Sequence, residues 1–444
     1  MKKIYFIVIL LSAFHFSFSQ EGFQFNSEKK KISIPFKISN NLIIIPVNVN
    51  GIDLSFLLDT GVDNTILFSL EETDSITFNN VKKIKMRGLG SGEPIDALHS
   101  KMNTLKIKGF EDVNHDIFII LDQGINFSSQ LGIPVHGIIG YQFFKNHFIE
   151  LNYKTKKINI YKNAKAFSPK RIKSFEEIPL DIEMKKPYIN SLITLNGKEI
   201  NAKLLIDSGG SDAIWLFQNQ AKGIVPPANY FEDFLGNGFS GEINGKRSRV
   251  EKIRIGNSTI DNSTISFPDE LSIRHVNMDS GRNGSIGSEI LKRFHVLFDY
   301  ENGKIYLKEN VDFKEPFNYN MSGLEIGHIG LHWVKEQVVL KANLVTTTNA
   351  IHVDLTDASP TSFKYLFSLK PKYEITKVRP NSPAELAGFK KGDVITNING
   401  HYAYQYKLEE ILEIMRSDEG KLIRLEVDRK GVIIKGKFQL KKIL

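Results

Sequence analysis

The first three hundred residues carry the same sequence pattern twice, and this duplication constrains the fold more than any other feature. Residues 45–68 read IPVNVNGIDLSFLLDTGVDNTILF, and residues 190–217 read NSLITLNGKEINAKLLIDSGGSDAIWLF. Each copy predicts a strand, an Asn-Gly turn and a second strand that runs into Asp-Thr-Gly or Asp-Ser-Gly. Asp59 and Asp207, which open these tripeptides, are 148 residues apart.

The two copies also agree downstream of the tripeptides. GIIGYQFFKNHFIELNYKTKKINIYK begins at Gly137, and GSIGSEILKRFHVLFDYENGKIYLKE begins 147 residues later, at Gly284. A nearly constant offset with matching turn chemistry indicates an internal repeat rather than a chance likeness. We therefore expect two similar lobes in one polypeptide.

Each copy is rich in β-branched and aromatic runs that are separated by Gly, Asn and Asp, and this pattern predicts an all-β lobe. The segments that begin at Gly137 and Gly284 each contain a pair of glycines, Gly137 with Gly140 and Gly284 with Gly287. A short helix is expected after each of these pairs, at residues 141–145 and 288–293. The first lobe is placed at residues 30–165 and the second at 175–310. The stretch between them contains Pro169 and several Lys and Arg residues, which suits a surface linker.

The N-terminus has the layout of a secretory signal peptide, which we place at residues 1–20. Lys2 and Lys3 precede an apolar run, and small or polar residues follow it. An uncleaved signal anchor is the alternative. No later run reaches the roughly 18 apolar residues that a spanning helix needs. We expect an exported protein, periplasmic, cell-surface or secreted, with no integral membrane segment after signal cleavage.

Composition excludes several classes of function. The chain has no cysteine, so it has no disulfide, no thiol nucleophile and no Cys-ligated zinc. The formal net charge is +8, but the basic residues are interspersed with acidic ones, which argues against a nucleic-acid partner. The histidines lack metal-ligand spacing, and G-x-S-x-G, H-E-x-x-H and Walker-type motifs are missing from the sequence. No cofactor or metal is expected.

The matched tripeptides offer a chemistry that needs two carboxylates. Two carboxylates about 3 Å apart cannot both ionise, so they share a proton and supply both a base and an acid for the attack of water on an amide. Asp59 and Asp207 are the candidate pair. Thr60 and Ser208 place a hydroxyl beside each aspartate, and Gly61 and Gly209 permit tight turns. The alternative is an ordinary Asx-type turn at the end of each strand.

A third tripeptide of this kind, Asp279-Ser280-Gly281, serves as an internal control. It follows HVNM rather than an apolar strand, and the first copy has no counterpart to it. We interpret it as a surface turn without a catalytic role.

The two tripeptides, each followed about eighty residues later by an apolar residue and glycine, resemble those of the retropepsin and pepsin-like aspartic proteases. The glycines of these later elements are Gly140 and Gly287. The resemblance implies two double-psi β-barrel lobes that form a pseudo-twofold bilobal unit, with Asp59 and Asp207 as a water-activating dyad. Val62 and Gly210 depart from the family pattern. The glycine-rich stretches 88–92 and 236–245 are either mobile flaps or surface hairpins.

The C-terminal part resembles a PDZ domain of exported proteases, a small α+β fold, which we place at residues 320–444. The resemblance rests on SPAELAGFKKGDVITNING, in which Ser382 and Pro383 predict the start of a helix. Apolar residues at i, i+3, i+4 and i+7 predict a second, amphipathic helix over residues 408–415. The best match to the carboxylate-binding loop of PDZ domains is residues 321–326. About fifty residues separate it from Tyr373, so an inserted hairpin or an alternative strand must lie between them.

The resemblance to a PDZ domain implies that this part captures an extended peptide by strand addition. The residues implied in peptide binding are Gly323, Leu324, Glu325, Ile326 and Leu408. The sequence as a whole predicts an exported aspartic endopeptidase that acts on extended peptides or proteins as a monomer. The alternative is a catalytically silent peptide-binding protein of the same fold.

Overall fold

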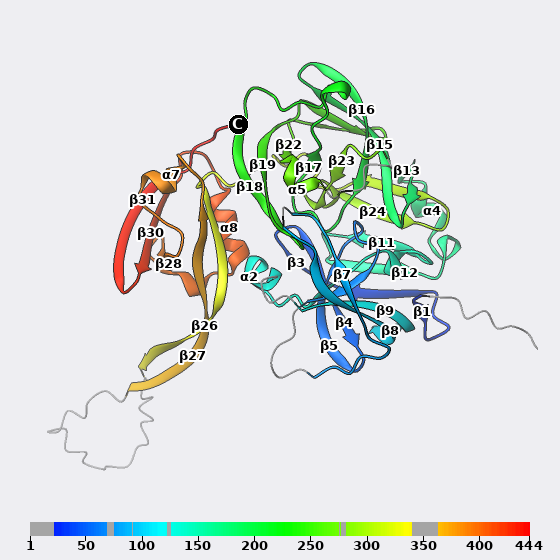
Figure 1. Ribbon diagram of the computed structural model, residues 1–444, viewed down its shortest axis with the longest axis horizontal. Helices are drawn as coiled ribbons and strands as arrows, with labels where there is room; N and C mark the ends of the chain where they lie inside the picture. Colours follow the sequence, from blue (N-terminus) through cyan, green and yellow to red (C-terminus); the bar gives the residue numbers. More distant parts are fainter. Residues whose placement is uncertain are drawn as a thin grey trace, which may run out of the picture. The chain divides into compact units, whose positions relative to one another are not determined.

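The computed structural model describes residues 22–68, 75–90, 92–121, 126–274, 276, 281–339 and 363–444. The expected signal peptide and Asp279 with Ser280 lie outside these residues. The chain forms two compact units. The first contains residues up to 126 and Pro134–Phe317, and the second contains Phe127–Ile133 and Asn318–Ile443. Strands dominate both units (Figure 1).

The first sequence copy forms a nine-stranded sheet with the order β1-β9-β6-β10-β5-β4-β8-β7, in which β3 also pairs with β4. The strands are β1 (Gln24–Phe25), β3 (Lys37–Ser39), β4 (Leu42–Val49), β5 (Ile52–Leu58), β6 (Thr65–Leu67), β7 (Lys82–Met86), β8 (Ile95–Ile107), β9 (Phe110–Ile120) and β10 (Gly137–Ile139).

The second copy forms a ten-stranded sheet with the order β18-β19-β22-β17-β23-β16-β15-β20-β21, in which β14 also pairs with β15. Its strands are β14 (Asp181–Glu183), β15 (Lys186–Leu195), β16 (Lys198–Ile206), β17 (Ile214–Leu216), β18 (Phe231–Gly238), β19 (Gly241–Arg249), β20 (Lys252–Ile255), β21 (Ser258–Asp261), β22 (Thr264–Pro268) and β23 (Gly284–Ile286).

A six-stranded sheet joins the two copies, with the order β13-β25-β24-β11-β12-β2. Its central strands β11 and β24 pair antiparallel, and Leu151 of the first copy lies opposite Val296 of the second. The six strands are β2 (Lys31–Pro35), β11 (Phe148–Asn152), β12 (Lys157–Tyr161), β13 (Glu176–Pro179), β24 (Phe294–Asp299) and β25 (Lys304–Glu309). Because each copy contributes equivalent strands, this sheet carries the pseudo-twofold relation that the repeat predicts.

Both Asn-Gly pairs form the hairpin turns expected of them. Asn50 and Gly51 have φ values of 48° and 99°, and Asn196 and Gly197 have φ values of 52° and 71°. Positive φ at both central residues is the geometry of a type I′ turn, which matches the twist of the flanking strands. The register of β4 with β5 and of β15 with β16 follows directly from these turns.

Short helices connect the strands of the first unit. The two that were expected after the glycine pairs are α3 (Tyr141–Phe144) and α6 (Ser288–Leu291), and both contribute buried apolar side chains to the core. Pro169 begins the linker helix α4 (Pro169–Ile172), which Ser168 caps by accepting a hydrogen bond from the N–H of Arg171. The remaining short elements are α5 (Glu270–Ile273), η1 (Ala164–Ala166) and η2 (Gln220–Lys222).

The second unit has a six-stranded sheet with the order β26-β27-β28-β30-β31, in which β29 pairs with β28. Its elements are β26 (Leu324–Val339), β27 (Phe363–Val378), β28 (Val394–Ile398), β29 (His401–Tyr402), β30 (Leu422–Arg429), β31 (Val432–Gln439), α2 (Phe127–Leu131), α7 (Pro383–Leu386), η3 (Ala403–Gln405) and α8 (Leu408–Met415). The hairpin of β26 and β27 is the insertion that the sequence required (Figure 1).

Candidate active site

The sheet places each tripeptide at the end of a buried strand. Asp59 follows β5 and Asp207 follows β16. A parallel neighbour supports each strand, β10 beside β5 and β23 beside β16. The N–H of Asp59 donates to the carbonyl of Ile139 at 2.9 Å, and the N–H of Asp207 donates to the carbonyl of Ile286 at 2.9 Å. The two aspartates therefore have the same backbone support.

Thr60 and Ser208 join the two tripeptides through four hydrogen bonds. The N–H of Thr60 donates to Ser208 Oγ at 3.0 Å, and the N–H of Ser208 donates to Thr60 Oγ1 at 2.9 Å. Each hydroxyl then donates to a strand of the opposite copy, Thr60 Oγ1 to the carbonyl of Ile206 at 2.7 Å and Ser208 Oγ to the carbonyl of Leu58 at 2.9 Å. Both side chains are fully buried, so this network of hydrogen bonds fixes the two turns against each other.

The glycines of the tripeptides let the carboxylates converge. The N–H of Gly61 donates to Asp59 Oδ1 at 2.6 Å, and the N–H of Gly209 donates to Asp207 Oδ1 at 3.1 Å. A Cβ atom at Gly61 would lie 3.0 Å from an oxygen of each carboxylate, and one at Gly209 would lie 2.1 Å from Asp59 Cγ. A side chain at either position would occupy the space between the carboxylates or displace them.

The two carboxylates interact directly. Burial raises the pKa of Asp59 to about 8, with a further contribution from the negative charge of Asp207. Burial also raises the pKa of Asp207, whereas Arg282 and the N–H groups of Gly209 and Gly210 act in the opposite direction. A side-chain hydrogen bond joins the two aspartates. This hydrogen bond raises the pKa of Asp59 and lowers that of Asp207, so a proton shared by the pair resides more on Asp59 than on Asp207.

Gly140 and Gly287, which follow β10 and β23, lie close to the backbone of the segments that begin with Asp59 and Asp207. A Cβ atom at Gly140 would lie 2.5 Å from the carbonyl oxygen of Asp59, and one at Gly287 would lie 2.2 Å from that of Asp212. Val62 and Gly210, which depart from the family pattern, also make equivalent backbone hydrogen bonds. The carbonyl of Val62 accepts from the N–H of Tyr141, and the carbonyl of Gly210 accepts from the N–H of Ser288.

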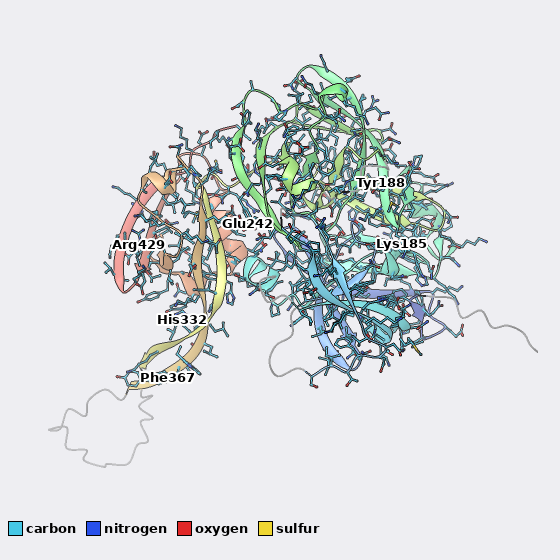
Figure 2. The ribbon with its side chains drawn as sticks, in the orientation of Figure 1. Lys185, Tyr188, Glu242, His332, Phe367 and Arg429 are labelled. Atoms are coloured by element: carbon cyan, nitrogen blue, oxygen red, sulfur yellow. The ribbon has the colours of Figure 1, made fainter. Side chains whose placement is uncertain are left out.

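Arg282 is a charged residue of the site that our sequence analysis missed. Arg282 is 9% exposed. Its guanidinium carbon lies 5.0 Å from the ring centre of Phe217, and its Nε donates to the carbonyl of Gly284 at 3.0 Å. It interacts electrostatically with Asp207, with Tyr188 and with Asp59. Tyr188, a buried residue of β15, is labelled in Figure 2.

The repeat itself contained the signal for Arg282. The 147-residue offset pairs this arginine with Val135, which is fully buried in the first copy. A cation at a position that is apolar in the other copy makes the two halves of the site electrostatically unequal.

The glycine-rich stretches meet at the tips of two equivalent hairpins. In the first copy the hairpin is β7 with β8, and in the second it is β18 with β19. The N–H of Ser240 donates to the carbonyl of Leu89 at 2.9 Å, and the N–H of Gly88 donates to Ser240 Oγ at 3.0 Å. The tips are thus hydrogen-bonded to each other rather than separate surface hairpins.

The hairpin of β18 and β19 contains part of a buried network of ion pairs. Arg247 of β19 pairs with Asp212 at 3.1 Å and with Asp233 at 2.9 Å. Asp212 also accepts hydrogen bonds from Trp215 and Ser266. Burial alone would raise the pKa of Asp212, but Arg247 and these donors hold it below its usual range. The 148-residue offset of the tripeptides places the uncharged Asn64 at the position of Asp212, so the first copy lacks the central carboxylate of this network.

The residues implied in peptide binding come together in the second unit. Gly323 has φ of 80°, and its carbonyl accepts from the N–H of Arg379 at 2.7 Å. Leu324 and Ile326, the first and third residues of β26, are buried, and Glu325 lies between them. Leu408 is the first residue of α8, which packs against β26.

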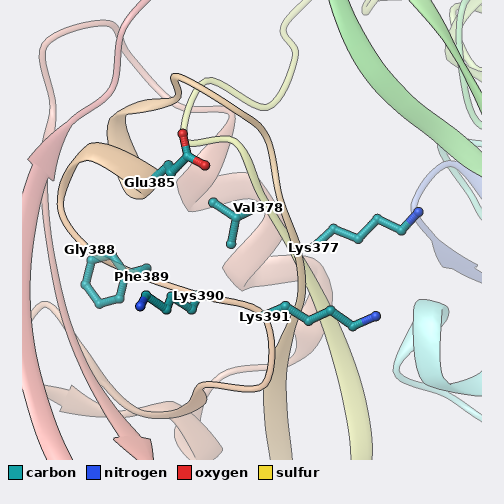
Figure 3. Close-up of a pocket in the computed structure, with 7 residues that line it drawn as sticks. All are labelled: Lys377, Val378, Glu385, Gly388, Phe389, Lys390 and Lys391. Atoms are coloured by element: carbon teal, nitrogen blue, oxygen red, sulfur yellow. The ribbon is translucent and has the colours of Figure 1, made fainter.

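A separate open pocket lies elsewhere on this unit (Figure 3). Its lining includes Lys377, Lys390 and Lys391 together with Glu385 and Phe389, and none of the five implied peptide-binding residues lines it. The lysines are surface side chains, so the pocket is a basic depression and not the predicted peptide groove.

Among the residues that the structure describes, no three His, Asp or Glu side chains lie close enough together to hold a metal ion. No helix among these residues is long and apolar enough to cross a bilayer.

Comparisons with known proteins find two family models that match parts of the chain. Residues 45–143 match the family model described as aspartyl protease, and residues 374–429 match that of the PDZ domain. Among solved structures, the crystal structure of aspartic proteinase from Irpex lacteus is 13% identical, with a TM-score of 0.40, and the match covers 64% of this chain and 99% of that one. No curated protein matches the chain. The chain thus carries an aspartyl protease-like region in its first sequence copy and a PDZ-like region near its C-terminus, in a structure that strands dominate.

Proposed function

We propose that the protein is an exported aspartic endopeptidase that hydrolyses peptide bonds through the dyad of Asp59 and Asp207. The observation that carries this proposal is the pair of interacting carboxylates, in which the pKa of the buried Asp59 is raised to about 8. A single retained proton gives one acid and one base in the same site, which general acid–base hydrolysis of an amide requires.

The geometry suggests how the roles are divided. Asp207 is partly exposed and lies near Arg282, so it is the better candidate for the ionised base. Asp59 is 8% exposed and holds the proton more strongly, so it is the better candidate for the acid.

Hydrolysis then proceeds in two balanced steps. Asp207 takes a proton from water as the water oxygen bonds to the scissile carbonyl carbon, and Asp59 gives its proton to the carbonyl oxygen. A proton from the dyad next passes to the leaving nitrogen as the C–N bond breaks, and the diol intermediate returns a proton, which restores the singly protonated pair.

The neighbouring residues hold this pair in place. The hydrogen bonds between Thr60 and Ser208 restrict the motion of both turns, and the N–H groups of Gly61 and Gly209 orient one oxygen of each carboxylate. Such pre-organisation lowers the cost of reaching the reactive geometry.

The second candidate is a catalytically silent protein that holds peptides with its lobes and its PDZ domain. The hydrogen-bonded hairpin tips are the observation that favours it, because a joined pair of hairpins restricts access for a substrate. Retention of both aspartates and both hydroxyls favours the enzyme. A silent protein has no need of two carboxylates at the cost of their mutual repulsion.

The decisive experiment measures cleavage of a denatured protein by the purified chain from pH 3 to pH 9, beside the Asp59→Asn variant. Cleavage by the wild type alone supports the enzyme. Peptide binding without cleavage by either protein supports the silent alternative. Export, a monomeric state and peptide capture by the PDZ domain are parts of the same proposal. Cell fractionation tests the first, light scattering the second, and binding measurements with free peptides the third.

A further inference from the structure

The second unit contains a short segment that comes from the middle of the first unit in sequence. Phe127–Ile133 belongs to the second unit, whereas the residues before and after it belong to the first. The segment begins with α2, in which Phe127 and Leu131 are four residues apart and therefore lie on the same helix face. Leu131 is 5% exposed, so its side chain is buried.

The segment lies between the edge strand and the long helix of the PDZ domain. Helix α2 packs against β26, the terminal strand of its sheet. At Gly327 of β26 a Cβ atom would lie 3.1 Å from Ser129 Oγ, and at Gly132 it would lie 2.6 Å from the Cβ atom of Leu408. Contacts with an edge strand on one side and with the start of α8 on the other place the segment where an added peptide would sit.

We propose that Phe127–Ile133 is an intramolecular ligand of the groove between β26 and α8, and that a free peptide binds there only by displacing it. The segment indicates the chemistry of such a peptide. Residues 126–134 read NFSSQLGIP and contain no charged side chain, so the groove fits an uncharged peptide with an aromatic residue and a leucine four positions later. This inference concerns binding alone and does not depend on peptidase activity.

The chain that leaves the segment leads directly to the support of Asp59. Only Pro134 and Val135 separate Ile133 from His136, whose N–H donates to the carbonyl of Ser55 at 2.8 Å. Strand β10 follows at once, and its last residue, Ile139, accepts the hydrogen bond from the N–H of Asp59. Exchange of the segment for a peptide therefore releases a stretch of chain that ends at this support.

The test uses the full chain and a fluorescein-labelled peptide of residues 126–134, followed by fluorescence anisotropy. All proteins carry Asp59→Asn so that the probe is not cut. A tethered competitor acts at an effective concentration in the millimolar range, so the intact groove should bind the probe weakly. Leu131→Asp removes the buried anchor of the segment and should tighten probe binding at least tenfold. Leu121→Asp, the same change at a leucine that is 58% exposed, should leave binding unchanged.

Gly132→Ala provides a second, milder test in case Leu131→Asp does not fold, and Gly197→Ala is its control. Gly132→Ala adds a methyl group against Leu408 at a residue with φ of 65°, and Gly197→Ala adds one at φ of 71° with no atom within 4 Å. Only Gly132→Ala should tighten probe binding. The proposal is wrong if Leu131→Asp and Gly132→Ala bind the probe with the same affinity as the parent chain. It is also wrong if neither variant binds the probe at 1 mM.

Discussion

Thr60 and Ser208 exchange backbone hydrogen bonds, each N–H donating to the hydroxyl of the other at 3.0 and 2.9 Å. Each hydroxyl also donates to a strand of the opposite copy, so each side chain serves as acceptor and donor at once. Because both side chains are fully buried, water cannot replace a lost partner. The turns that carry the two aspartates are therefore held across the interface between the copies as well as by hydrogen bonds within each copy.

Removal of one hydroxyl should cost both stability and activity. Thr60→Ala leaves the N–H of Ser208 and the carbonyl of Ile206 without partners, which costs about 1–3 kcal/mol of unfolding free energy. We expect kcat to fall with it, while Thr60→Ser, which keeps the hydroxyl, retains most of both. Urea unfolding and peptide cleavage measure the two quantities. Equal behaviour of the Ala and Ser variants would contradict the assignment.

Loss of either carboxylate should abolish cleavage without unfolding the protein. Asp59→Asn and Asp207→Asn each leave one ionisable group, which cannot act as acid and base in the same turnover. Cleavage of a denatured protein at the optimum pH measures the effect, with near-ultraviolet circular dichroism as the check on folding. Asp279→Asn, in the tripeptide interpreted as a surface turn, should cleave like the wild type. Activity in Asp207→Asn would show that the second copy is not catalytic.

Asp59→Asn should also stabilise the protein at neutral pH. The pKa of Asp59 is about 8 in the folded protein and 3.8 as its ordinary value, so its contribution to stability is fully present below about pH 4 and is lost as pH rises towards 8. Asparagine cannot ionise and avoids this loss. We expect the unfolding free energy of the variant to exceed that of the wild type at pH 7 by on the order of 2 kcal/mol, with little difference at pH 4. A variant less stable at pH 7 would refute the raised pKa.

Arg282 should set the acidic limit of activity. Its positive charge lowers the pKa of Asp207 and thereby keeps the base ionised at lower pH. Arg282→Met should move the acidic limb of the kcat/KM profile to higher pH, because Asp207 then becomes protonated sooner. Arg254→Met, at an exposed arginine of β20, is the matched control and should leave the profile unchanged. A uniform fall in activity at every pH would indicate a structural role instead.

The repeat made much of the first unit predictable. Asn-Gly turns fix hairpin register, so the partners of β5 and β16 followed from sequence, as did the helices after the two glycine pairs. In the PDZ domain the cap at Ser382 and the helix from Leu408 were also confirmed, because both depend on local chemistry.

Features that depend on distant contacts escaped prediction. Arg282 follows an Asp-Ser-Gly that suggested a surface turn, and its burial arises from Phe217, which is far away in sequence. The ion pairs of Arg247 and the contact between Gly132 and Leu408 are likewise non-local, and no period or turn signal encodes them. Sequence patterns predict elements, whereas these contacts arise only when the elements pack.

The last prediction concerns the contribution of the PDZ domain to cleavage. If it holds substrates, binding there raises their effective concentration at the dyad without changing the chemistry. Deletion of residues 320–444 should then weaken cleavage of a protein substrate below saturation and spare a short peptide that fills only the active site. Because the deletion also exposes Leu131, the truncated chain should carry Leu131→Ser, with the full chain bearing that substitution as its control. If both substrates are cut less well by the same factor and the melting temperature falls, the domain stabilises the protein and does not recruit substrate.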